Sequence, residues 1–259
     1  MNNIIKEYND NGYIFIKKNF FKNIKKLIKK KILFYSNYIL LKNNIINNKI
    51  NSFDRLSDRL IFYDKKCNII SNLYDILPAD PDIFNLVNNT NFIKITKDLS
   101  IKNPLVGTIP TIRFDRPMDA KRNTPKHRDF WYSFLSKNSI TIWFNLEDDK
   151  KELGNLIVYP KSQKIIKDGI QDSKKGTYEY KNKDIKLEEK IEINLKKDEI
   201  LIFNQNLIHQ SGINKSTKAR ISVQIRYNDL NSLKEFKSSF KCTISDYVSN
   251  KQRELLNDK

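Results

Sequence analysis

The sequence of residues 209–227, HQSGINKSTKARISVQIRY, decides the fold class, because its second half alternates between polar and apolar side chains. A period of two is typical of a β-strand and predicts one over Arg220–Tyr227. The stretch Ser139–Leu146 alternates in the same way. A sheet with one face in solvent would also give this pattern. Trp143 lies on a polar face, however, and so large an aromatic side chain favours the alternative of a cavity behind both strands. The polar faces would then carry Ser139, Thr141, Trp143 and Asn145 on the first strand, and Arg220, Ser222, Gln224 and Arg226 on the second.

The fold expected from these periods is mainly β with N-terminal helices. Six stretches predict strands: Val106–Phe114, Ser139–Leu146, Leu156–Tyr159, Ile191–Leu195, Ile200–Phe203 and Arg220–Tyr227. Short strands in such number indicate a sandwich or a jelly roll. Before them, a short strand is expected at Tyr13–Ile16 and helices over residues 20–33, 54–62 and 83–99.

The 259 residues suit one domain, 1–259. Residues 1–103 would form a mainly helical wrapping, 104–228 the jelly-roll core and 229–259 a C-terminal extension. Residues 160–190, rich in Lys, Asp and Gly, predict a long mobile loop that could close over a site.

The net charge of +18 would ordinarily suggest a nucleic-acid partner. The chain is saturated with Lys, Asn and Ile, whose codons are A/T-rich, so we attribute much of this charge to genome composition and regard nucleic acid as an unlikely partner. No stretch is long and apolar enough to predict a membrane segment. The two cysteines, Cys67 and Cys242, suggest reduced thiols and a cytoplasmic location. The oligomeric state is unknown from the sequence.

Arginine is more informative than lysine here, because six arginines lie in the segments expected to build the cavity. They either offer planar forks to an anionic ligand or pair with local carboxylates such as Asp115, and both readings stay open. These arginines are Arg113, Arg116, Arg122, Arg128, Arg220 and Arg226.

The chain has only two histidines, His127 and His209. His127 is followed two positions later by Asp129, and in an extended backbone residues two apart point the same way. Two histidines and one carboxylate form the facial triad of non-haem iron(II) oxygenases, which leaves coordination positions open. His-x-Asp alone is a weak signal, since lone histidines are more often surface or hydrogen-bonded core residues.

The residues after His209 strengthen the hypothesis. Arg220 follows eleven positions later, at the start of a predicted strand, and Ser222 shares its face. An arginine beside a hydroxyl suits the distal carboxylate of 2-oxoglutarate.

The chain resembles the phytanoyl-CoA dioxygenase family of iron(II)/2-oxoglutarate oxygenases, from NGYIFI near residue 11 to about Tyr227. The matching pieces, in order, are TIRF at 111–114, His127-Arg128-Asp129, SITIWFNLED at 139–148, Gly154-Asn155-Leu156, Pro160-Lys161-Ser162, and a closing motif of His209, Ser211-Gly212, Asn214, Arg220 and Ser222. The chain departs from the family at Arg128, where Gln or Thr is common, and at Lys161 and Gln163 in a stretch that is often Pro-Gly-Ser-His.

The resemblance implies a double-stranded β-helix of the jelly-roll, cupin-like type. It implies Fe(II) on His127, Asp129 and His209, with 2-oxoglutarate and O2 as cosubstrates. It also implies a cosubstrate pocket formed by Arg220, Ser222, Trp143 and Thr141. Related halogenases have Gly or Ala in place of the carboxylate, so Asp129 points to hydroxylation or a related oxidation; nothing in the sequence indicates donors that would hold a halide there.

The substrate is expected to be a small, possibly anionic metabolite, with Arg113, Arg116 and Tyr132 as candidate contacts. Two alternatives remain: a cupin-like protein that binds metal without turnover, and an oxygenase that acts on nucleic acid. The pairing of Arg220 with Ser222 argues against the first, because a bare metal site does not require it.

Overall fold

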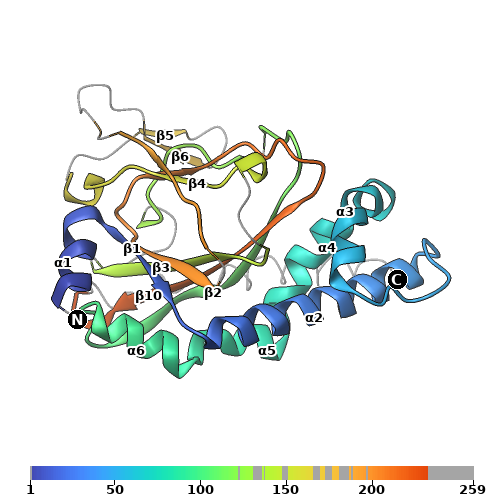
Figure 1. Ribbon diagram of the computed structural model, residues 1–259, viewed down its shortest axis with the longest axis horizontal. Helices are drawn as coiled ribbons and strands as arrows, with labels where there is room; N and C mark the ends of the chain where they lie inside the picture. The colour runs from blue at the N-terminus through green and yellow to red at the C-terminus, as the bar shows by residue number, and fades with distance from the viewer. Residues whose placement is uncertain are drawn as a thin grey trace, which may run out of the picture.

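A computed structural model of the chain describes residues 2–121, 123–130, 136, 138–147, 151–165, 170–172, 177–180, 187, 189–196 and 198–232. Two β-sheets stand one above the other in Figure 1, with helices below them and at both ends. No helix among these residues is long and apolar enough to cross a membrane.

The larger sheet has five strands in the order β1-β8-β3-β10-β2, and all neighbours are antiparallel. Its strands are β1 (Tyr13–Lys17), β2 (Pro104–Asp115), β3 (Ser139–Asn145), β8 (Glu199–Asn204) and β10 (Arg220–Asp229). Strands distant in sequence are neighbours here, which is the arrangement of a jelly roll rather than of consecutive hairpins.

The smaller sheet has the order β7-β4-β9 and consists of β4 (Leu156–Val158), β7 (Ile191–Glu192) and β9 (His209–Ser211). An isolated antiparallel bridge between His127 and His209 extends it by one residue. The rings of Phe203 on β8 and His209 on β9 lie 4.8 Å apart, so the two sheets face each other. The predicted fold class, a jelly roll with N-terminal helices, is confirmed.

The apolar face of the larger sheet packs on the N-terminal helices. Ile221, Val223, Ile225 and Tyr227 on β10 are all buried, and the Tyr227 hydroxyl donates to the carbonyl oxygen of Val87 at 2.8 Å. This confirms that the polar faces of β3 and β10 point the other way, between the sheets.

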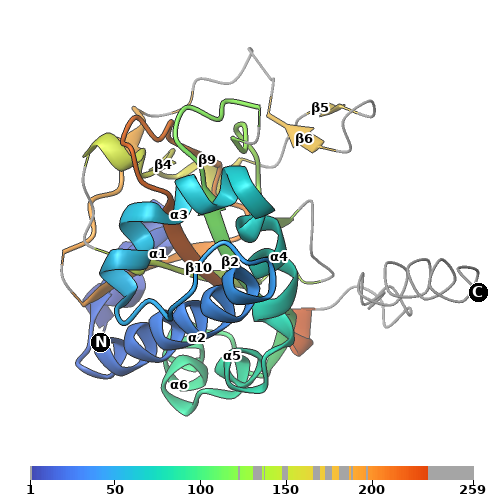
Figure 2. The ribbon, with the colours of Figure 1, turned by 90° about the vertical axis from the view of Figure 1, so that its right-hand side faces the viewer.

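The helical layer consists of α1 (Asn2–Asn11), α2 (Phe20–Lys42), α3 (Phe53–Cys67), α4 (Ile69–Ile76), α5 (Pro81–Phe84) and α6 (Thr90–Asp98). Figure 2 views the molecule from the side on which α2, α3 and α5 lie in front of the sheets. In α2, the buried residues Ile24, Ile28 and Ile32 recur every four positions and give the helix its apolar stripe.

The single helix expected over residues 83–99 is wrong. The chain forms α5 and a short 3₁₀ turn, Asn85–Asn88, and then α6 begins after Asn89. The Asn89 side chain accepts hydrogen bonds from the backbone N–H groups of Asn91 and Phe92, which makes it the N-cap of a new helix.

The long loop expected over residues 160–190 also contains structure in its described parts. A 3₁₀ turn spans Ser162–Lys164, and β5 (Ile170–Asp172) pairs with β6 (Thr177–Glu179). The expected C-terminal extension is described only to Ser232, after β10 and a 3₁₀ turn, Leu230–Ser232.

Candidate active site

The structure brings His127, Asp129 and His209 together between the two sheets. The backbones of His127 and His209 exchange two hydrogen bonds, at 2.9 and 3.0 Å, and Asp129 follows two positions after His127. One ligand atom from each residue lies within 4.8 Å of the other two, and all three residues are buried. A pair of histidines 82 positions apart in sequence is therefore fixed by strand pairing.

Each imidazole is oriented by the backbone. Nδ1 of His127 lies 2.8 Å from the Pro125 carbonyl oxygen, and Nδ1 of His209 lies 2.9 Å from that of Leu207. A proton on Nδ1 satisfies both carbonyl groups and leaves the Nε2 lone pairs available to a metal. Both Nε2 atoms point to the same oxygen, Asp129 Oδ1, each at 3.6 Å.

The second oxygen of Asp129 is held by the larger sheet. Thr141 Oγ1 on β3 donates to Oδ2 at 2.6 Å, and Arg226 Nε on β10 donates to the same atom at 3.1 Å. The family resemblance implied that Thr141 lines the cosubstrate pocket; in the structure its hydroxyl donates to the Asp129 carboxylate. Trp143, two positions further along β3, is buried on the same face.

The electrostatics of the three residues suit a cation. Burial raises the pKa of Asp129, but Arg226 and the two histidines outweigh it and hold that pKa well below its usual range. Burial, assisted by His127, lowers the pKa of His209 to about 3. At neutral pH the cluster thus offers an ionised carboxylate and a neutral His209.

The depressed pKa of His209 predicts acid sensitivity of the metal-free protein. The unfolded chain binds a proton near pH 6.5 and the folded chain only near pH 3, so stability is lost as pH falls from about 6.5 toward 3. Between pH 6.5 and 5 the loss from this group should be up to ~2 kcal/mol in the free energy of unfolding. Urea unfolding with a chelator present measures it.

His209→Asn is the matched variant, because its amide can still donate to the Leu207 carbonyl but does not titrate. Its stability should fall less steeply over this interval. Parallel profiles for the variant and the wild type would contradict the assignment of a neutral, buried imidazole.

Arg220 lies in a second cluster, around Asp115 at the end of β2. Its Nη2 and Nε donate to Asp115 Oδ2 at 2.7 and 3.1 Å, and Nη1 donates to the Gly154 carbonyl oxygen. Arg113 Nε donates to the other oxygen, Oδ1, at 2.7 Å. Burial raises the pKa of Asp115, but Arg220 and Arg113 together hold it below its usual range. Of the two readings of the arginines, local pairing with Asp115 is thus realised for both.

The cluster nevertheless keeps anion-binding capacity. Two guanidinium groups share the Asp115 carboxylate. Within the part of the chain that the structure describes, three of the five Arg220 donors are used. Ser222, on the same strand face, has a buried hydroxyl oxygen without a hydrogen-bond partner among the described residues. A buried hydroxyl without a partner costs free energy, so a ligand carboxylate fits here.

Gly154 makes this arrangement feasible. Its φ is +70°, and a Cβ would lie 2.3 Å from the carbonyl carbon of Ile213, so only glycine brings its carbonyl oxygen to Arg220 in this way.

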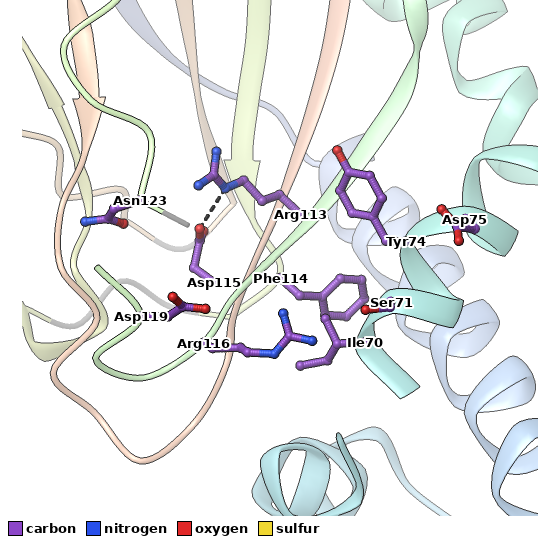
Figure 3. A pocket seen from close by; sticks show the side chains of 10 residues that line it. All are labelled: Ile70, Ser71, Tyr74, Asp75, Arg113, Phe114, Asp115, Arg116, Asp119 and Asn123. Atoms are coloured by element: carbon purple, nitrogen blue, oxygen red, sulfur yellow. Dashed lines mark hydrogen bonds and ion pairs between the residues drawn. The ribbon is translucent and has the colours of Figure 1, made fainter. Parts of the chain in front are cut away.

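The candidate substrate residues Arg113 and Arg116 line a cleft of about 430 Å³ between α4 and the end of β2. Figure 3 shows Tyr74 and Ile70 of α4 opposite them. Arg116 Nε lies 2.5 Å from Asp64 Oδ2, so this arginine is ion-paired, as is Arg113. Tyr132 and Arg122 lie outside the described residues.

Sequence reasoning named Asp115 and Arg226 but did not establish which residues each contacts. The role of Asp115 as the shared partner of two arginines and that of Arg226 at Asp129 depend on cross-strand register. Ser211 was noted only as part of a motif, yet it shares the buried face of β9 with His209 and pairs with Leu156, beside Asn155 and Gly154. Alternation along β9 was the sequence signal that could have placed Ser211 on the same face as His209.

Comparisons with known proteins agree with this geometry. Residues 99–222 match the family model described as phytanoyl-CoA dioxygenase. No curated protein sequence matches the chain. Among solved structures, the epimerase SnoN in complex with Fe3+, alpha ketoglutarate and nogalamycin RO is similar, with a TM-score of 0.56, 13% identity and coverage of 88% of this chain and 83% of that chain.

Two further structures share the fold. EctD from S. alaskensis, solved with 2-oxoglutarate and 5-hydroxyectoine, has a TM-score of 0.55 at 13% identity, with coverage of 88% of this chain and 76% of that one. The alpha-ketoglutarate-dependent carbocyclase SnoK has a TM-score of 0.54 at 15% identity, with coverage of 88% and 84%. At these identities the likeness establishes the fold.

Proposed function

We propose that this chain, whose residues 99–222 match the phytanoyl-CoA dioxygenase family model, is a non-haem iron(II) oxygenase that uses 2-oxoglutarate and O2 to oxidise a small molecule. The observation that carries the proposal is the convergence of two imidazole Nε2 atoms on one carboxylate oxygen in a buried site.

The donor set fits iron(II). His127, His209 and Asp129 would hold the metal through Nε2, Nε2 and Oδ1, since the other polar atom of each side chain faces a protein partner. Two histidines and one carboxylate leave positions for further ligands, unlike the closed sets of structural zinc sites. When bound, iron(II) supplies the activation of O2 that is coupled to decarboxylation of 2-oxoglutarate.

The cosubstrate would bind between the metal site and the Asp115 cluster. Arg220 and Ser222 would bind its distal carboxylate, and buried Trp143 would line the pocket and exclude water. The similar SnoN and EctD structures hold alpha ketoglutarate or 2-oxoglutarate, which supports the assignment.

Within this chemistry we assign hydroxylation, because Asp129 keeps the carboxylate at the metal. The substrate would be a small metabolite. The cleft in Figure 3 is a candidate place for it, because Arg113 and Asp115 of the Asp115 cluster line this cleft. The sequence suggested an anionic substrate because of arginines such as Arg113 and Arg116. Both are ion-paired with aspartates in the structure, so these two arginines do not support an anionic substrate.

The test is succinate formation from 2-oxoglutarate by protein loaded anaerobically with Fe(II). We expect slow succinate release that requires iron, 2-oxoglutarate and O2 together, and that accelerates when a panel of metabolites includes the substrate. The product should then gain 16 mass units, as expected for insertion of one oxygen atom. Loss of all three dependences would contradict the proposal, and a chlorinated product from the wild type would contradict the assignment of hydroxylation.

A further inference from the structure

The environment of Asp129 Oδ2 contains two donors from neighbouring strands. Thr141 Oγ1 lies 2.6 Å away and Arg226 Nε 3.1 Å away, while Arg226 Nη2 lies 3.4 Å from Oδ1. Hydrogen bonds from a cation and from a hydroxyl to an ionised carboxylate are among the strong ones in proteins.

The two donors are positioned by the sheet and not by Asp129. Thr141 and Arg226 are directly opposite each other in the β3–β10 pairing, so their side chains share one face. Thr141 is fully buried, and the Arg226 side chain is only 13% exposed and is also held by the Gln224 side-chain oxygen. Removal of the residue 129 side chain therefore leaves both donors in place.

We propose that Thr141 and Arg226 form an anion cradle, a built site for one carboxylate. In the native protein this cradle binds Asp129 Oδ2 and would thereby direct Oδ1 toward the metal; when the Asp129 carboxylate is absent, the cradle binds a small exogenous carboxylate. The sequence indicated no donors of this kind beside Asp129, because they come from strands 12 and 97 positions away.

The role in metal binding rests on the proposed function, but the cradle itself can be tested without metal. Arg226 acts through Asp129, so it is a positioning residue. In a variant without the Asp129 carboxylate, an anion in the cradle would lie beside the proposed metal site. It would also neutralise the Arg226 guanidinium, which otherwise stays partly buried without its carboxylate partner.

The experiment uses Asp129→Gly, which removes the atoms that acetate replaces: one carbon and a carboxylate. Without metal, acetate should raise the melting temperature of the variant, while neutral acetamide of the same shape should not. With Mn(II) as the probe, acetate should raise metal affinity by about tenfold or more, the effect of one charge-assisted contact.

The double variant Asp129→Gly/Arg226→Met should lose both acetate effects, and Asp129→Gly/Thr141→Val should weaken them. Asp129→Gly/Arg116→Met removes an arginine that pairs with Asp64 instead, so it should keep them. If the glycine variant does not fold, Asp129→Ala with formate gives the same comparison.

The cradle proposal would be overturned if the acetate effects persisted in Asp129→Gly/Arg226→Met. It would also be overturned if a folded Asp129→Gly variant showed no acetate effect. Failure of the proposed function looks different: Mn(II) would then bind no better with acetate, while the metal-free melting shift would persist and keep its dependence on Arg226.

Discussion

Replacement of His127, Asp129 or His209 by alanine is expected to lower the affinity for Fe(II) by more than about 100-fold, because even loss of an outer-shell partner costs about 10- to 100-fold at such sites. Each variant removes one of three protein ligands and leaves too few to hold the metal. Succinate formation should fall with metal binding. Anaerobic metal titration followed by equilibrium dialysis measures the change.

Gln210→Ala is the matched control for this series. Gln210 lies on β9 between His209 and Ser211, but its side chain points to the opposite face, where Tyr159 donates to it. Its metal affinity should stay within about twofold of the wild type. Full metal affinity in any of the three ligand variants, with folding intact by circular dichroism, would contradict the assignment of that ligand.

The second large effect is expected at Arg220. Arg220→Ala should weaken 2-oxoglutarate binding by about 10- to 100-fold, the contribution of a charge-assisted hydrogen bond to a carboxylate. Arg220→Lys should weaken it less, since lysine keeps the charge but lacks the planar fork. Fe(II) affinity should be unchanged in both, because Arg220 pairs with Asp115 rather than with Asp129.

The removal of Arg220 leaves the buried Asp115 carboxylate paired with Arg113, so the variant needs a stability control. Arg220→Ala/Asp115→Asn removes that carboxylate charge and should restore part of any lost stability without restoring cosubstrate affinity. Unchanged 2-oxoglutarate affinity in Arg220→Ala would move the role to another residue; Ser222 and Ser211 on facing strands would be the next to replace.

The fold and the clustering of His127, Asp129 and His209 could be predicted from the sequence because their signals are local or rare. The alternation of polar and apolar residues predicts β3 and β10, although β3 is buried throughout and β10 over most of its length. The number of short strands expected in the C-terminal half predicts the jelly roll. The cluster could be predicted because histidine is rare in this chain. With only two histidines, His-x-Asp and one distant histidine give a single candidate triad.

The roles of the arginines could not be predicted, because they depend on which residues the strand register sets opposite each other. Arg220 and Arg226 are six positions apart on one strand face, yet the first is paired with Asp115 and the second with Asp129. Nothing in the local sequence distinguishes them. The same holds for Thr141, whose partner Asp129 comes from a different segment.

The most direct measurement of the central claim is an anaerobic titration of the Fe(II)-loaded protein with 2-oxoglutarate, followed by visible absorption. Chelation of iron(II) by a 2-oxo acid gives a metal-to-ligand charge-transfer band that neither component shows alone. The account predicts a band that saturates at one 2-oxoglutarate per chain, is absent in His209→Ala, and needs at least about tenfold more cosubstrate in Arg220→Ala. A wild-type protein that binds Fe(II) but develops no band at any 2-oxoglutarate concentration would contradict it.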